Sequence, residues 1–350
     1  MSINLSTTTV TSYDLTILEH LNSLTKISLE SCHYLDTGTM RILGKCMKLV
    51  DISLKGSPSA IGMPNILPLS GYLQYSGSSV TNLNVAKTLL TNEALLEIAE
   101  FASELCVLDV SGNPSVSDIG VHELLSQCRC LVSIDVSTNV HVTGKSFLIG
   151  GGGGSSSSSS SSYALPPASP TLPPSPSNNN NNNSSAGHND YGPSSLNLLL
   201  ETVSLAGCSQ TNSRTVQILA MSCHMNLVKL ILNGCREVGD EGLRFLSEFC
   251  PNVKEISLGG CTEITSFGVN WLVSKRTTGE ERMPCLVRVN MHGLYRVQDT
   301  FLNSITRSSF IHRTDTLEMA RTSITDNGLM MLVKRWEGTR GRGERGLGNY

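Results

Sequence analysis

The chain has 350 residues, of which 39% are hydrophobic and 16% charged, and its formal net charge is −3. This near-neutral balance gives no overall field that would favour nucleic acid or a membrane surface, and no apolar run approaches the ~20 residues of a membrane helix. The polar, Thr-rich start has no secretory signal, so the eleven cysteines are expected to be reduced thiols in the cytoplasm or the nucleus.

A strand-like pattern recurs from the start of the chain, in most cases at a spacing of roughly 25 to 28 residues. It reads apolar-x-x-apolar-x-apolar-x-x-Cys/Asn, and Ile3 and Leu5 already match its second and third apolar positions. Because Met1 then falls inside a strand, we expect the chain to start in the middle of a repeat. Further copies, of which those at positions 49 and 80 are weaker, begin at Leu24, Leu49, Val80, Leu105, Leu131, Leu200, Leu227, Val253 and Leu286, and Leu317 with Met319 forms a last partial copy.

A helical pattern follows the strands. It begins apolar, Ser/Thr/Gly, Asp, x, Gly, apolar in residues 116–121, 238–243 and 324–329, with a looser copy in residues 264–269. Ser, Thr and Asp at these positions can cap the unpaired N–H groups of a starting helix. A unit of one strand and one helix cannot bury its apolar side alone, so stacked copies are expected to form a parallel sheet inside and a layer of helices outside.

Two segments depart from the repeat. Residues 150–195 are a Gly/Ser/Pro/Asn-rich insert of low complexity, which has almost no apolar content and is expected to be disordered. The insert enters in the helical half of a repeat, so the sheet can continue past it. The tail of residues 334–350 is basic and is expected to be a disordered end. The repeats then occupy residues 1–149 and 196–333.

The strand pattern ends in cysteine or asparagine, where the chain turns outward. We expect these side chains to form a ladder that satisfies backbone groups between neighbouring turns. A second set of cysteines ends the helices and is expected to pack as small hydrophobic side chains. Since thiols and carboxamides interchange in the ladder and no Cys-x-x-Cys pair exists, we expect neither disulfide bonds nor a metal site. The ladder positions are Cys32, Asn113, Asn139, Cys208, Cys235 and Cys261, and the helix-end positions are Cys46, Cys128, Cys223 and Cys250.

These repeats resemble the leucine-rich repeat in its cysteine-containing subtype, as in the F-box/leucine-rich-repeat substrate receptors of SCF-type ubiquitin ligases. The resemblance implies an α/β solenoid, or horseshoe, with a parallel sheet on the concave face and helices on the convex face. It also implies a substrate-binding role in ubiquitin-dependent protein degradation, with catalysis carried out by partner subunits. The chain contains no F-box, so a ligase adaptor and a cullin are expected to bind through a module upstream of Met1.

The residues between the buried strand positions are expected to lie on the concave face of the sheet. This face is small, polar and of mixed charge, and it lacks the density of Arg and Lys that phosphate contacts require. It also lacks a deep apolar pocket for a small ligand, so the expected partner is an extended protein or peptide. The candidate partner-binding residues are Asp109, Asp135, Ser204, Lys229, Ile231, Asn233, Glu255, Ser257, Arg288, Asn290 and His292.

Two alternatives to a ligase receptor remain open. The same face would also serve a free-standing scaffold or inhibitor protein without ligase association. The second alternative is nucleotide binding by Gly144, Lys145 and Ser146, which follow a strand as in a phosphate-binding loop. That loop needs glycine at its first position, and this chain has Asn139 there. We therefore expect no catalytic residues, no cofactor and no metal.

Overall fold

The computed structural model describes residues 1–36, 38–58, 79–148 and 198–343, all of which belong to one compact unit. The low-complexity insert predicted over residues 150–195 lies outside the described residues.

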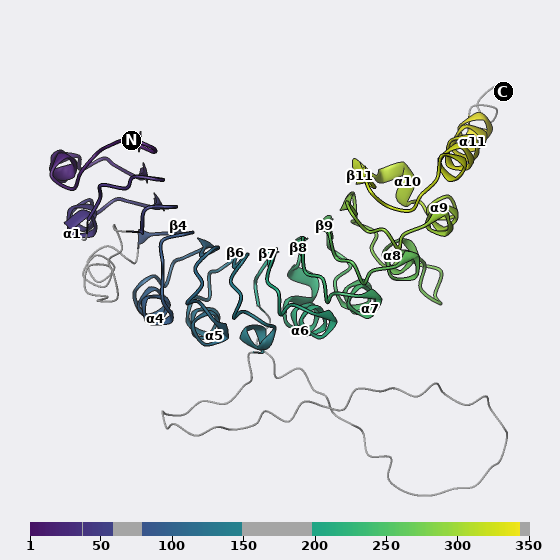
Figure 1. The fold of residues 1–350 in the computed structure, drawn as a ribbon, viewed down its shortest axis with the longest axis horizontal. Coiled ribbons are helices and arrows are strands. Elements are labelled where there is room, and N and C mark those ends of the chain that lie inside the picture. Colours follow the sequence, from purple (N-terminus) through teal and green to yellow (C-terminus); the bar gives the residue numbers. More distant parts are fainter. Residues whose placement is uncertain (37, 59–78, 149–197, 344–350) are drawn as a thin grey trace, which may run out of the picture. The chain divides into compact units, whose positions relative to one another are not determined.

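The described residues form an eleven-stranded parallel sheet in which each strand pairs with the next one along the chain (Figure 1). β6 pairs directly with β7, so the sheet continues past the insert as the sequence predicts. This order confirms the predicted fold class, an α/β solenoid with a parallel sheet. The strands are β1 (Ser2–Asn4), β2 (Lys26–Ser28), β3 (Asp51–Ser53), β4 (Asn82–Asn84), β5 (Val107–Asp109), β6 (Ser133–Asp135), β7 (Thr202–Ser204), β8 (Lys229–Ile231), β9 (Glu255–Ser257), β10 (Arg288–Asn290) and β11 (Thr316–Glu318).

The central residue of each three-residue strand points into the core. From Ile27 in β2 to Val289 in β10, these side chains are at most 3% exposed, and full burial of each contributes roughly 1.5–3 kcal/mol. Ile3 in β1 and Leu317 in β11 are only partly buried, since each has a neighbouring repeat on one side alone. Burial of the core therefore depends on a stacked neighbour on both sides.

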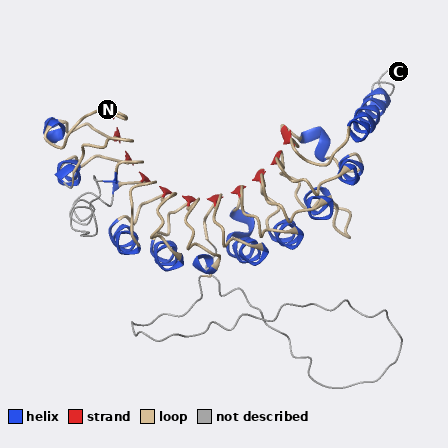
Figure 2. Ribbon diagram, in the orientation of Figure 1, coloured by secondary structure: helices blue, strands red, loops and turns tan. Residues whose placement is uncertain are grey.

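Helices lie on the opposite side of the strands from the inner face of the sheet (Figure 2). Their buried apolar side chains, such as Leu243 and Leu246, complete the core between sheet and helices. The α-helices are α1 (Gly38–Gly44), α4 (Asn92–Phe101), α5 (Asp118–Gln127), α6 (Ser213–Cys223), α7 (Asp240–Phe249), α8 (Ser266–Val273), α9 (Asp299–Ile305), α10 (Phe310–Arg313) and α11 (Asp326–Gly343), and the 3-10 helices are η1 (Asp14–His20), η3 (Lys145–Phe147) and η4 (His224–Asn226).

The first side chain of each helix from α4 to α9 connects one repeat to the next, a contact that we call the repeat clamp. The Asp240 carboxylate accepts hydrogen bonds from the backbone N–H (2.7 Å) and the hydroxyl (2.6 Å) of Thr265 in the following repeat. Asp299 accepts from Thr325 in the same way, at 2.8 and 2.7 Å. The sequence predicts that these residues cap helices. In the structure neither α7 nor α9 has a side-chain cap, and the two aspartates link neighbouring repeats instead. Related clamps join Asn92 to Ser117, Asp118 to Thr143, Ser213 to Gly239 and Ser266 to Gln298.

The glycine of the helical pattern makes room for the clamp. A Cβ atom at Gly268 would lie 2.1 Å from Oδ1 and 2.8 Å from Cα of Asp240, and one at Gly328 would lie 2.3 Å from Oδ1 of Asp299. The Asp and Gly that recur in the sequence therefore meet across the boundary between two repeats rather than within one.

The ladder predicted at the strand ends is present in the structure. The thiol of Cys208 donates to the carbonyl of Val136 (3.2 Å), and the thiol of Cys235 donates to that of Leu205 (3.1 Å). Asn113 takes the same position with its amide, 2.9 Å from the Val85 carbonyl. All eleven cysteines lie in the described part of the chain and are free thiols.

Burial keeps the ladder thiols unreactive. Loss of solvent raises the pKa of Cys208 to about 12 and that of Cys235 to about 11. Because only a thiolate is an effective nucleophile or metal ligand, these side chains act as neutral hydrogen-bond donors at neutral pH.

The end of the described chain differs from the disordered tail predicted for residues 334–350. Helix α11 continues through this segment to Gly343, and residues 344–350 lie outside the described residues. A helix that has already begun at Asp326 gains one hydrogen bond for each added residue, so it extends into a sequence without an apolar period.

Replacing Asp240 with alanine is expected to lower the free energy of unfolding by about 1.5–3 kcal/mol, because the two donors of Thr265 lose a charged acceptor. Urea denaturation followed by circular dichroism measures the change. The matched control is Asp326→Ala, at the equivalent position of α11, where no clamp partner follows in the described chain. This substitution is expected to lower the free energy of unfolding by less than about 1 kcal/mol. Equal losses would show that the clamp contributes nothing.

The substitution Gly268→Ala is expected to destabilise the protein by about 2 kcal/mol or more, although alanine favours a helix by roughly 1 kcal/mol. The reason is the overlap of the new methyl group with Asp240. Gly242→Ala is the control, since its nearest neighbours, the Cα of Ser213 and the Cβ of Val216, lie 3.3 Å away and need to shift only slightly. Thermal denaturation of the two variants should rank Gly268→Ala clearly below Gly242→Ala.

A thiol reagent applied to the native protein at pH 8 is expected to modify exposed Cys130 first, then the partly exposed Cys106 and Cys285. The eight buried cysteines should react only on unfolding, because each is shielded from the reagent. Mass spectrometry of native and urea-unfolded protein counts the labels. Rapid native labelling of Cys208 or Cys235 would contradict the ladder.

Candidate functional site

The first residues of β8, β9 and β10 form a charged row on the inner face of the sheet. Nζ of Lys229 lies 2.8 Å from Oε1 of Glu255, whose Oε2 lies 3.5 Å from Nη1 of Arg288. Nη2 of Arg288 also lies 3.8 Å from the Asp315 carboxylate, just before β11. Such exposed pairs contribute about 1 kcal/mol or less to stability. The row therefore offers alternating charges to a partner while its own net charge is balanced.

The third residues of the strands form a second row, which is continuous by register from β5 to β10. Strands in a sheet lie ~4.8 Å apart, so this row is about 24 Å long. Ser204 is 5% exposed, whereas the other members are partly exposed. Its members are Asp109, Asp135, Ser204, Ile231, Ser257 and Asn290. Sequence reasoning placed all six on one face, and the structure brings them together there.

The two remaining candidates, Asn233 and His292, lie two residues beyond the second row. Oδ1 of Asn233 accepts from the Ser257 hydroxyl and the Gly259 backbone N–H, both at 2.8 Å. Oδ1 of Asn290 accepts from the backbone N–H of His292, also at 2.8 Å. These carboxamides hold the chain as it leaves the strands. The exposed His292 side chain remains available for a partner.

Asp109 and Asp135 form an acidic step in the second row, side by side on β5 and β6. Each uses Oδ1 to accept from the backbone N–H two residues on, Ser111 at 3.0 Å and Ser137 at 2.8 Å. Neither forms an ion pair with any residue that the structure describes, and no Lys or Arg stands in either row on β4 to β7. Their negative charge is therefore turned toward solvent without a counter-charge.

Sequence reasoning missed two residues of this face. Val107 begins β5 beside the acidic step and is 40% exposed, which is unusual for an apolar strand residue here. The sequence feature that could have placed Val107 on this face is its position directly before the buried Leu108, since neighbouring strand residues point to opposite sides. Asp315 joins the charged row through Arg288, and nothing in the sequence indicates this contact because it depends on how β10 and β11 align.

A metal site and a phosphate-binding loop are the two kinds of reactive site that the sequence raises. Within residues 1–36, 38–58, 79–148 and 198–343, no group of His, Cys, Asp and Glu could hold a metal ion. The segment that resembles a phosphate-binding loop begins at Asn139, which is buried and bonded within the ladder, to the Val110 carbonyl at 3.0 Å and the Asn113 N–H at 2.7 Å. Lys145–Phe147 forms a 3-10 turn. Over the described part of the chain, no helix is long and apolar enough to cross a membrane.

Comparison with known proteins gives a distant sequence relative and a clear likeness in fold. No family model matches the chain. The Antagonist of mitotic exit network protein 1 of Candida glabrata is 23% identical over 232 residues, which are 64% of this chain and 36% of that protein. The chain thus spans well under two thirds of the length of this curated relative.

Two solved structures share the architecture. Rad7 in the crystal structure of the yeast Rad7 and Elc1 complex has a TM-score of 0.54 and 13% identity, with 93% of this chain and 78% of that chain covered. An internalin (inlF) from Listeria monocytogenes str. 4b F2365 has a TM-score of 0.50 and 13% identity, with 91% and 80% covered. The sequential parallel sheet, the helices opposite it and this likeness together show that the chain has the leucine-rich-repeat solenoid fold.

Proposed function

We propose that this chain is a protein-recognition module that binds an extended segment of a protein partner along the inner face of its sheet. The observation that carries the proposal is the continuous second row, in which Asp109 and Asp135 turn uncompensated charge toward solvent. An acid that is left without a counter-charge contributes to specificity by selecting a partner that supplies one. A solenoid face of stacked strands suits an extended partner, since neighbouring repeats present side chains at regular intervals.

The pattern of charges defines the partner's chemistry. A cationic side chain of the partner would lie over Asp109 and Asp135, and its apolar side chains would contact Val107 and Ile231. Over β8 to β10 the alternating Lys229, Glu255 and Arg288 favour a polar segment of mixed charge. The acidic step repels phosphate, so a nucleic acid is a poor fit.

The more specific form of the proposal is the substrate-binding part of an SCF-type ubiquitin ligase receptor. It is supported by the resemblance of the repeats to those of F-box/leucine-rich-repeat receptors and by the likeness in fold to Rad7, which was crystallised as a complex with Elc1. In this form a ligase adaptor and a cullin bind through a module other than the repeats. Catalysis then belongs to the partner subunits, and the repeats supply binding alone.

A second candidate is a free-standing inhibitor or scaffold that uses the same face without a ligase. It is favoured by the sequence similarity to the Candida glabrata protein, which is named as an antagonist of the mitotic exit network. An antagonist needs only to occupy a partner's surface, and the inner face would suffice for that.

The double substitution Asp109→Asn with Asp135→Asn tests the binding face. Asparagine keeps the Oδ1 acceptor for the Ser111 and Ser137 backbone N–H groups, so the fold is retained while both charges are lost. We expect recovery of the partner from cell extract by the tagged chain to fall at least about tenfold, equivalent to ~1.4 kcal/mol. Quantitative mass spectrometry of the co-purified proteins measures the change.

The control removes two acidic charges from the helices instead, by Glu123→Gln on α5 and Glu241→Gln on α7. It should leave the recovered proteins unchanged. Equal recovery by the Asp109/Asp135 variant and the wild type would refute binding on this face. A ligase adaptor and a cullin among the recovered proteins support the receptor form, whereas reproducible partners without them support the free-standing form.

A further inference from the structure

Helix α11 carries apolar side chains on a side that no described residue covers. Met330 is 55% exposed, Val333 47% and Leu329 39%. At the position equivalent to Met330, the helices α5, α7 and α8 carry His122, Arg244 and Asn270, which are all polar. The position equivalent to Leu329 in α7 is Leu243, which is fully buried. Helix α11 therefore exposes Leu329, whose equivalent in α7 is buried, and Met330, whose equivalents in α5, α7 and α8 are polar.

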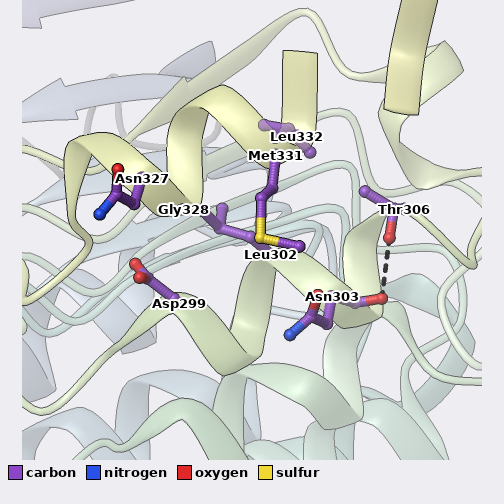
Figure 3. Close-up of a pocket in the computed structure, with 8 residues that line it drawn as sticks. All are labelled: Asp299, Leu302, Asn303, Thr306, Asn327, Gly328, Met331 and Leu332. Carbon is purple, nitrogen blue, oxygen red and sulfur yellow. Dashed lines mark hydrogen bonds between the residues drawn. The ribbon is translucent and has the colours of Figure 1, made fainter. Parts of the chain in front are cut away.

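The other side of α11 faces α9; there Gly328 is buried and Leu332 partly buried, while Met331 is 63% exposed. Gly328, Met331 and Leu332 face α9 across a cavity of about 80 Å³, which is also lined by Asp299 and Leu302 (Figure 3). This volume is far below the roughly 300–1,000 Å³ of small-molecule sites, so the cavity is a packing gap. By contrast, the shallow groove formed by Asp326, Leu329, Met330, Val333 and Lys334 is lined by α11 alone.

The polar groups at this end are also open. Asp326 holds the clamp position that in Asp240 and Asp299 accepts from the next repeat, and no described residue pairs with its carboxylate. The opposite end of the sheet is different. There the backbone N–H and hydroxyl of Thr11 donate to Asp14 of the same repeat, at 2.9 and 2.7 Å. The first repeat is therefore closed by its own side chain, while the last described repeat is not.

We propose that the open side of α11 is an interface with a second copy of this chain, formed by two antiparallel α11 helices related by a twofold axis at Met330. Asp326 and Lys334 stand four residues before and after Met330, about 12 Å apart along the helix. In an antiparallel pair, the Asp326 carboxylate of one copy meets the Lys334 ammonium of the other at both ends. Met330 and Val333 of the two copies then pack between these ion pairs.

This pairing is self-complementary in both shape and charge, as a twofold interface requires. A head-to-tail arrangement is disfavoured, because the Thr11 donors that would meet the Asp326 carboxylate of another copy are already bonded to Asp14. The groove has few apolar residues, so the contact is smaller than the ~800 Å² per partner of a standard interface. The dimer is accordingly weak and dependent on concentration.

Sedimentation velocity of the full chain over a wide range of concentrations tests the interface. We expect a monomer–dimer equilibrium in the wild type. The single variants Asp326→Lys and Lys334→Asp each place like charges opposite one another at both ends, and each should raise the dimer Kd at least about tenfold. An equimolar mixture of these two variants should dimerise again, since every charge then meets its opposite.

The result of the mixing experiment is specific to the antiparallel geometry and requires no loss of fold, because both side chains are exposed. The Asp109→Asn with Asp135→Asn variant should dimerise as the wild type does, which separates this interface from the partner-binding face. A wild type that stays monomeric at every concentration overturns the proposal. So does a dimer that is unaffected by either single variant, or one that is lost instead on changing exposed Tyr13 and Ile17 at the first repeat.

Discussion

The structure depends on the fact that no repeat can satisfy itself. Each strand of three residues and its helix leave an apolar side and several backbone groups open, and only the adjacent repeats close them. Three contacts do this at successive depths. The central strand residues fill the core, the Cys/Asn ladder takes up carbonyl groups at the turn, and the repeat clamp joins the helix starts. Removing a neighbour would open all three together.

Aspartate has different roles in this protein, depending on its position in the stack of repeats. Asp240 is consumed by the clamp, with both donors of Thr265 on its carboxylate. Asp109 gives one oxygen to its own turn and keeps its charge for the solvent-facing side of the sheet. Asp326 occupies a clamp position that no described residue completes. A carboxylate on this fold is thus structural where the next repeat supplies its donors, as at Asp240, and keeps its charge for solvent where it does not, as at Asp109.

Function on this fold follows from what the stacking leaves unpaired. Burial raises the pKa of the Cys208 and Cys235 thiols, which disfavours the reactive thiolate, and Asn139 at the start of segment 139–146 is bonded within the ladder rather than free to hold a phosphate. On the inner face, Lys229 and Arg288 are balanced by Glu255 and Asp315, whereas the acids of β5 and β6 have no ion-pair partner among the described residues. Recognition by charge and shape is what such a surface can perform.

The sequence by itself determined the stacked strands and which residues share the inner face, because a repeated apolar spacing and a side-chain period of two admit one arrangement. Thus Asp109 and Asn290 could be placed on the same face of the sheet although 181 positions separate them in the numbering. It could not show that Asp240 reaches Thr265, since an aspartate at a helix start satisfies its own helix or a neighbour's with the same chemistry. It predicted a disordered tail over residues 334–350, of which residues 334–343 belong to helix α11 and the rest lie outside the described residues. The balance of Arg288 by Asp315 and the exposure of Met330 were decided only by tertiary structure, because both depend on which repeat stands alongside.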